Sequence, residues 1–177
     1  MKKKRANSPT LPGFARISEP FKFPAQPYEY KVQALRECPT PEALQVCGTP
    51  KKAADYWRLH IPAHPYFNPE CECVAVLILN KSLRIKGHYL VSVGTMDTAI
   101  VHARDVFRVA IMASAYAIIL AHNHPSGDPT PSNDDIKATR HLIRAGELLG
   151  IEVLEHVVIG NPNHASLYEL GHFPNKR

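Results

Sequence analysis

Two histidines separated by one residue, His122 and His124, are the side chains of this sequence best suited to bind a metal ion. They follow an apolar run typical of a buried strand, and side chains two residues apart in extended backbone project to the same side. Asp135, in the expected first turn of the next helix, supplies a carboxylate. Two neutral imidazoles and a carboxylate leave the fourth position of a tetrahedral zinc ion open to water, which is typical of catalytic sites. These three residues together could therefore bind one Zn²⁺ per chain.

The same segment also fits a helix start that needs no metal. Ser132 and Asp135 have the spacing of a capping box, in which the serine caps the helix and the acid reaches back to the helix end. Asp128 and Asp134 are interpreted as loop and cap acids. An HxH pair alone is a weak indication of metal binding, so the residue types by themselves leave both interpretations open.

The complete spacing is more specific than either part. From His122 to Asp135 the sequence reads HxHx7SxxD, which resembles the JAMM signature of the JAB/MPN metalloproteases. The surrounding HNHPSGDPTPSNDD is similar to the RadC-like branch of that family, and the resemblance extends from about Thr49 to Phe173. It implies a zinc metallohydrolase whose α/β arrangement is similar to the three layers of cytidine deaminases.

The family also carries a glutamate at the start of an upstream strand. Glu70 and Glu72 both precede the apolar run Cys73–Leu79, and because they are two residues apart, alternation does not choose between them. In RadC-like sequences the glutamate stands eight residues before a turn acid that follows the strand. Asn80 occupies that turn position here, so the resemblance selects Glu72. The change from aspartate to asparagine at Asn80 affects a turn and not the site.

The resemblance implies a role for each of these residues. Zinc would generate hydroxide at neutral pH, and Glu72 would accept the water proton and later deliver it to the leaving amine. Ser132 would stabilise the oxyanion of the tetrahedral intermediate. His156 is interpreted as a core residue or as a neighbour of the ligands, because the ligand set is already complete.

Strands and helices are expected to alternate around this motif. Apolar runs predict strands at Tyr28–Leu35, Cys73–Leu79, Leu83–Ile85, Tyr89–Val93, Ala117–Ala121 and Ile151–Ile159. Caps and apolar periodicity predict helices from Pro50 to Leu59 behind a Thr49 cap, from Asp97 or Thr98 to about Met112, and from Asn133 to Leu149 with Gly150 as the stop. This order predicts an α/β fold with a mixed sheet and helices on both faces.

Prolines and charges divide the chain unevenly. We interpret residues 1–27 as a basic mobile arm, 28–48 as lead-in elements, 49–174 as the metallohydrolase domain and 175–177 as a tail. Residues 1–60 contain 11 Lys and Arg against 5 Asp and Glu, whereas residues 61–177 contain 10 against 11. The near-neutral domain argues against a cleft that follows phosphates, so any nucleic-acid contact is expected to be weak and made by the arm.

Targeting signals and cysteines point to a cytoplasmic protein. No apolar run approaches the roughly 18 residues of a membrane helix, and the basic start is not followed by an apolar signal core. We therefore expect no membrane association and free cysteines. Cys71 and Cys73 are expected to pack as small apolar residues instead of binding metal.

Three functions are compatible with this pattern. We expect a zinc peptidase or isopeptidase acting on a peptide or protein conjugate, because the domain resembles proteases that cleave ubiquitin-like conjugates. The first alternative is a metal-dependent hydrolase or accessory protein acting on nucleic acid, since the RadC family has been labelled as DNA repair. However, residues 1–60 show no glycine-rich hairpin matching the helix-hairpin-helix region of longer members. The second alternative, a non-catalytic scaffold, does not require Glu72 or both histidines.

Deletion of residues 1–27 is expected to leave folding and zinc content intact, because this segment has no hydrophobic period with which to join a core. Thermal unfolding and metal analysis of the shortened protein test this. A shortened protein that no longer folds would show that the arm packs on the domain.

Overall fold

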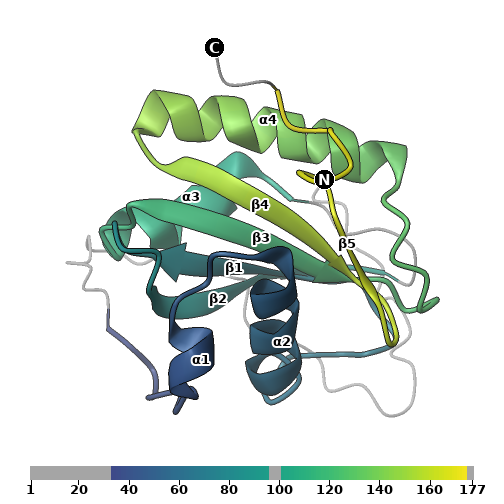
Figure 1. Ribbon diagram of the computed structural model, residues 1–177, viewed down its shortest axis with the longest axis horizontal. Coiled ribbons are helices and arrows are strands. Elements are labelled where there is room, and N and C mark those ends of the chain that lie inside the picture. The colour runs from purple at the N-terminus through teal and green to yellow at the C-terminus, as the bar shows by residue number, and fades with distance from the viewer. Residues whose placement is uncertain (1–32, 96–100, 175–177) are drawn as a thin grey trace, which may run out of the picture. The chain divides into compact units, whose positions relative to one another are not determined.

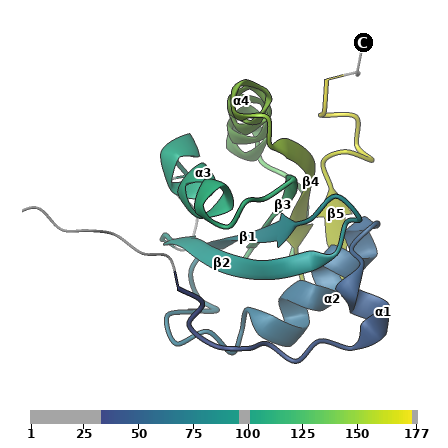
Figure 2. The same cartoon turned by 90° about the vertical axis from the view of Figure 1, so that its left-hand side faces the viewer.

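A five-stranded sheet lies between two layers of helices in the computed structural model, which describes residues 33–95 and 101–174 (Figures 1 and 2). The elements in chain order are α1 (Glu42–Gln45), α2 (Pro50–His60), β1 (Cys73–Leu79), β2 (Ile85–Val93), α3 (Ala103–Met112), β3 (Ala117–Asn123), α4 (Asn133–Leu149), β4 (Glu152–Ile159) and β5 (His164–Ser166). Helices α1 and α2 lie on one face of the sheet, and α3 and α4 on the other (Figure 2). The predicted α/β fold is confirmed.

The sheet order β2-β1-β3-β4-β5 brings the motif together. Strand β1 is antiparallel to β2 and to β3, whereas β3 and β4 are parallel and β5 is antiparallel to β4. Parallel neighbours need a crossover, and α4 is that crossover. The end of β3 and the start of α4 are therefore separated only by the loop of residues 124–132.

Alternate residues of the buried strands supply two cores. One face of β1 and β3 packs with α2 around Tyr56 and Trp57. The other face packs with α3 and α4 around Phe107 and Leu142. Ile118 and Leu120 belong to the second core, so alternation directs the side chain of His122 toward α4 as well.

The cap signals of two helices are confirmed. Thr49 caps α2, accepting a hydrogen bond from the Lys52 backbone N–H, and Pro50 takes the first helical position. Gly150 ends α4 with φ of 66°, in the left-handed region that favours glycine. Within the described residues, the helices are all too short or too polar to cross a bilayer.

Several predicted boundaries were wrong. The two strands expected at Leu83–Ile85 and Tyr89–Val93 are one strand, β2, because Gly87 and His88 continue the pairing with β1 at the edge of the sheet. Strand β3 runs two residues further than expected and includes His122 and Asn123. Strand β5 was missed, since its three residues carry no apolar alternation.

The helix expected from Asp97 or Thr98 begins only at Ala103; those two residues lie outside the described part. The predicted helix included Val101 because this residue fits a helical spacing of apolar residues. In the structure Val101 packs on the second core, but its backbone is not helical. Of the strand expected over Tyr28–Leu35, only residues 33–35 are described, and they form no strand.

The loop between β3 and α4 is held against the residues that follow β4. Gly127, with φ of 82°, donates its N–H to the carbonyl of His124, and its own carbonyl accepts the N–H of Asn161. A Cβ atom on Gly160 would lie 2.4 Å from the Gly127 carbonyl oxygen and 2.8 Å from Pro129 Cδ. Only glycine allows this approach at position 160.

Gly160→Ala is expected to destabilise the protein by about 1–3 kcal/mol, as overpacking of a close contact typically does. The atoms it meets belong to backbone and proline, which cannot turn away. Gly87→Ala is the matched control, because a Cβ there meets nothing within 4 Å. Denaturant unfolding of both variants measures the difference, and equal stability of the two would contradict the close approach at Gly160.

Candidate metal centre

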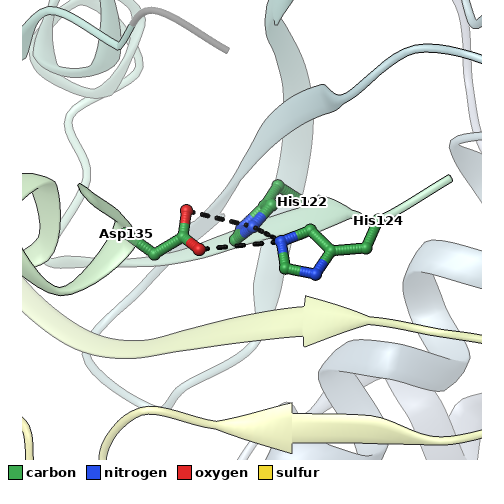
Figure 3. A group of neighbouring side chains, drawn as sticks. All are labelled: His122, His124 and Asp135. Atoms are coloured by element: carbon green, nitrogen blue, oxygen red, sulfur yellow. Dashed lines mark hydrogen bonds and ion pairs between the residues drawn. The ribbon is translucent and has the colours of Figure 1, made fainter. Parts of the chain in front are cut away.

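Side chains from the end of β3 and the start of α4 converge on one point (Figure 3). The Nε2 atoms of His122 and His124 are 3.0 Å apart. Asp135 Oδ1 lies 3.2 Å from His122 Nε2, and Asp135 Oδ2 lies 3.6 Å from His124 Nε2. Within the described residues, this is the group of three metal-ligating side chains close enough to share an ion.

The spacing and the chemistry of these atoms fit zinc. A tetrahedral zinc ion with bonds of about 2.0–2.1 Å holds its ligand atoms about 3.3 Å apart. The three separations, 3.0, 3.2 and 3.6 Å, lie around that value. Two imidazole nitrogens and one carboxylate are the ligand set of a catalytic centre that keeps a position for water. The residues predicted as metal ligands are thus brought together as expected.

The proton of His124 is directed away from the convergence point. Its Nδ1 lies 2.8 Å from the backbone carbonyl oxygen of Asp128. A carbonyl oxygen only accepts, so Nδ1 carries the hydrogen, and in the neutral ring Nε2 keeps a free lone pair. The Asp128 carboxylate, by contrast, accepts hydrogen bonds from Thr130 and stabilises the loop, as predicted for a loop acid.

Asp135 forms the capping box and faces the histidines at the same time. Its Oδ2 accepts hydrogen bonds from the backbone N–H and the hydroxyl of Ser132, each at 2.7 Å. In return the Asp135 N–H donates to the Ser132 hydroxyl at 3.1 Å. The sequence left the helix cap and the metal site as alternatives. In the structure the Asp135 carboxylate belongs to the capping box and also to the candidate metal site. Since the serine has one hydroxyl hydrogen, an oxyanion contact would require this hydroxyl to turn away from Asp135.

Electrostatics couple Asp135 to the histidines. Burial opposes ionisation of Asp135, but its close contacts with His122 and His124 and the hydrogen bonding of Ser132 outweigh it and hold its pKa well below the usual range. The hydrogen bond with Asp135 raises the pKa of His124, against the opposing effect of burial. When the His124 ring is protonated, its second proton lies on Nε2, in the place that a metal ion would take, and metal binding should release that proton.

Glu72 reaches the same site from the start of β1. Its side chain is 14% exposed, and Oε1 lies 3.9 Å from His124 Nε2. Its backbone N–H donates to the Thr95 carbonyl, and its carbonyl accepts from the Gly94 N–H. The two residues beside Glu72, Cys71 and Cys73, are hydrogen-bonded to the Asn123 side chain. Its amide accepts a hydrogen bond from the Cys73 N–H and donates one to the Cys71 carbonyl.

Asn123 is a site residue that the sequence interpretation missed. It stands between the two histidines, and its side chain holds the segment that carries Glu72 from the opposite face of β3. A buried amide at the end of an apolar strand was the available signal, because such a group needs hydrogen-bond partners.

Glu70 lies elsewhere. It is exposed, stands in a turn closed by the Cys71 N–H on the Asn68 carbonyl, and does not line the pocket. The sequence interpretation treated Glu70 and Glu72 as side chains of one extended segment that point the same way. This was wrong, because extended backbone begins only after this turn. Cys73 is buried as predicted, whereas Cys71 is only half-buried, and both are free thiols.

The converging atoms open into a pocket of about 350 Å³. One part of its wall is polar and acidic, formed by the ligands with Glu72, Ser132 and Asp134. An apolar part is formed by Val74, Val101, Leu120, Ala138 and Leu142, and Pro125, Ser126 and His156 complete the lining. Among the described residues that line it there is no lysine or arginine.

His156 lies behind His122, in the interior between β4 and α4. Its Nε2 is 2.8 Å from His122 Nδ1, and its Nδ1 is 2.6 Å from the Thr139 hydroxyl. Burial lowers the pKa of His156 to about 3, so the ring is neutral near pH 7. The position agrees with the interpretation of His156 as a core residue beside the ligands.

Comparison with known proteins places this site in a family. The RadC-like JAB domain matches residues 47–172. A UPF0758 protein of Caldanaerobacter subterraneus is 50% identical over 98 residues, which are 55% of this chain and 42% of that protein. A UPF0758 protein of Staphylococcus carnosus is 43% identical over 127 residues, 71% of this chain and 53% of that protein.

The matched region thus spans about half the length of these relatives or less. The family match over residues 47–172 contains every residue of the candidate metal centre, from Glu72 to His156, and all five strands. The match covers well over half of the chain, so this protein belongs to the family of RadC-like JAB domains.

Proposed function

We propose that this chain is a zinc-dependent hydrolase of the JAMM type that cleaves a peptide or isopeptide bond. One observation carries the proposal: two imidazole Nε2 atoms and a carboxylate converge within 3.0–3.6 Å of one another. The Asp128 carbonyl holds the proton of His124 on the far nitrogen. Two imidazole nitrogens and a carboxylate oxygen this close together direct lone pairs at one point, which a cation there would stabilise. Nitrogen and carboxylate ligands favour zinc.

A bound zinc ion would supply a Lewis acid that lowers the pKa of a water molecule toward about 7 and polarises a carbonyl. The protein supplies the rest of the chemistry. His122, His124 and Asp135, which line the pocket, would hold the ion. Glu72, largely buried in the same pocket, would accept a proton from the attacking water and deliver it to the leaving amine.

Ser132 would contribute in two ways. Its backbone N–H and hydroxyl hold Asp135 in place. Because Ser132 also lines the pocket, its hydroxyl would be placed to turn from Asp135 toward the oxyanion of the reacting amide. Contributions of this kind amount to roughly 2.7–4 kcal/mol in well-studied acyl-transfer sites.

The pocket favours a peptide-like substrate over a nucleic acid. Its acidic side chains, Glu72, Asp134 and Asp135, would repel phosphate groups, and none of its described lining residues is a lysine or arginine. Its apolar wall suits an aliphatic side chain next to the scissile amide. We accordingly infer a peptide or protein conjugate as the substrate and retain DNA as an outcome of the substrate test.

Wild-type protein is expected to bind about one zinc ion per chain, and Asp135→Asn to weaken binding by more than about 100-fold. Loss of a residue next to a ligand typically costs 10–100-fold, and loss of a ligand should cost more. The amide oxygen of asparagine can still accept a hydrogen bond from Ser132, so the capping box and its contribution to stability are largely retained. Metal analysis and chelator competition measure the affinity. Added zinc should raise the thermal stability of the wild type but not of the variant.

Ser132→Ala is the control for the cap. It should keep zinc while losing at most about 0.5–2 kcal/mol of stability. An Asp135→Asn protein that binds zinc like the wild type would remove Asp135 from the ligand set, and absence of zinc uptake by the wild type would sink the proposal.

Glu72→Gln is expected to keep zinc and abolish turnover, because the amide preserves the shape of the side chain but cannot carry a proton. Glu70→Gln is the matched control, since Glu70 is exposed and outside the pocket. Peptide, isopeptide-linked and DNA substrates should be screened with and without chelator, and both variants assayed on the substrate that responds. Full activity of Glu72→Gln, or a response by DNA alone, would overturn the proposed reaction.

A further inference from the structure

We propose that Thr139 and His156 form a hydrogen-bonded chain that holds the proton of His122 on Nδ1 and so keeps its Nε2 free to bind metal. Both are positioning residues, because they act through the His122 ring. The inference rests on the proposed zinc site, but it concerns the metal-free protein as well.

Three short hydrogen bonds connect the two ligands that stand farthest apart in the sequence. The Thr139 hydroxyl lies 2.6 Å from the backbone carbonyl oxygen of Asp135, one helical turn before it. The same hydroxyl lies 2.6 Å from His156 Nδ1. His156 Nε2 then lies 2.8 Å from His122 Nδ1. All three side chains of the chain are buried, with relative exposures of 0% for Thr139, 5% for His156 and 2% for His122.

The direction of the chain follows from the threonine. At 2.6 Å, its oxygen and the Asp135 carbonyl oxygen require a hydrogen between them, and only the hydroxyl has one. That hydrogen is therefore unavailable to His156. The contact between Thr139 and His156 must be a donation from Nδ1–H of the imidazole to the hydroxyl oxygen.

His156 passes this constraint to His122. The two ring nitrogens of His156 contact a histidine and a threonine and no carboxylate among the described residues, and burial disfavours a charged imidazolium. The neutral ring has one N–H, which Thr139 already accepts, so Nε2 is an acceptor. Its donor can only be Nδ1–H of His122.

The consequence lies on the far side of the His122 ring. A neutral imidazole with its hydrogen on Nδ1 has a free lone pair on Nε2, the atom 3.2 Å from Asp135 Oδ1. With the hydrogen on Nε2 instead, His122 could not bind metal in this orientation. The backbone carbonyl of Asp128 performs the same task for His124. Each histidine ligand thus has its own device for setting its tautomer.

Thr139→Val tests the chain because valine keeps the shape and removes the hydroxyl. Without this acceptor, His156 is free to protonate Nε2 and donate to His122 Nδ1, which moves the His122 proton to Nε2. Thr139→Ser restores the hydroxyl and is the matched control. We expect zinc affinity, measured by chelator competition, to fall about 10- to 100-fold in the valine variant and to stay within about threefold of the wild type in the serine variant.

Nitrogen NMR of ¹⁵N-histidine-labelled, metal-free protein reads the tautomer directly, with His122 assigned by comparison with His122→Asn. The wild type and Thr139→Ser should show His122 protonated on Nδ1, and Thr139→Val should show it on Nε2. Wild-type protein with His122 protonated on Nε2 at neutral pH would overturn the inference, even if the valine variant does not fold.

Equal zinc affinity of Thr139→Val and the wild type would also overturn it, while leaving the proposed hydrolase untouched. If the serine variant lost as much affinity as the valine variant, packing and not the hydroxyl would be responsible, and the inference would fail. A wild-type protein with the expected tautomer but no zinc uptake would instead refute the proposed function and keep the chain of hydrogen bonds.

Discussion

The position of one carboxylate, that of Asp135, determines the rest of the site. It is fixed by the first turn of α4, where two hydrogen bonds from Ser132 hold Oδ2 and leave Oδ1 toward His122. The positive end of the helix favours the same negative charge. One side chain therefore belongs to the helix cap and is also the proposed metal ligand. The ligand is held in place by local hydrogen bonds before any ion binds, which lowers the entropic cost of forming the centre.

Around this carboxylate, hydrogen bonds fix the tautomers of the two histidines as well as the positions of the side chains. A backbone carbonyl sets the tautomer of His124, and we infer that Thr139 and His156 set that of His122. Asn123 fastens the segment carrying Glu72 to β3. The Asp128 contact lies within one loop, whereas the contacts of Thr139, His156 and Asn123 come from elements other than the one bearing the functional side chain. The site thus depends on the order of the strands, which places β1 and β4 on either side of β3.

The sequence predicted local features well because their causes are local. The buried strand Cys73–Leu79 and the α4 helix with its cap and stop follow from patterns within a few residues. The three converging side chains follow from the HxHx7SxxD spacing, which its resemblance to the family signature made specific. The predictions failed where a distant contact decides the structure. Strand β2 continues through Gly87 because β1 pairs with it, and no local pattern signals that pairing.

Long-range hydrogen bonds were equally invisible in the sequence. In the sequence Asn123 is only the residue between the two histidines of the HxH pair. Its role was not predicted, because the hydrogen bond between its side chain and the Cys73 backbone joins residues 50 positions apart. The choice between Glu70 and Glu72 rested on family resemblance, whereas the structure separates them by a turn that places Glu70 in solvent. Sequence spacing also could not show that the capping box and the metal site share Asp135.

X-ray absorption spectroscopy of the zinc-loaded protein tests the central claim most directly, because it reports the atoms bound to the metal. We predict two imidazole nitrogens and two oxygens, from Asp135 and water, at about 2.0–2.2 Å. A sulfur atom at about 2.3 Å would instead indicate a thiolate ligand such as Cys71 or Cys73. That result, or fewer than two imidazoles, would contradict a zinc centre built by His122, His124 and Asp135.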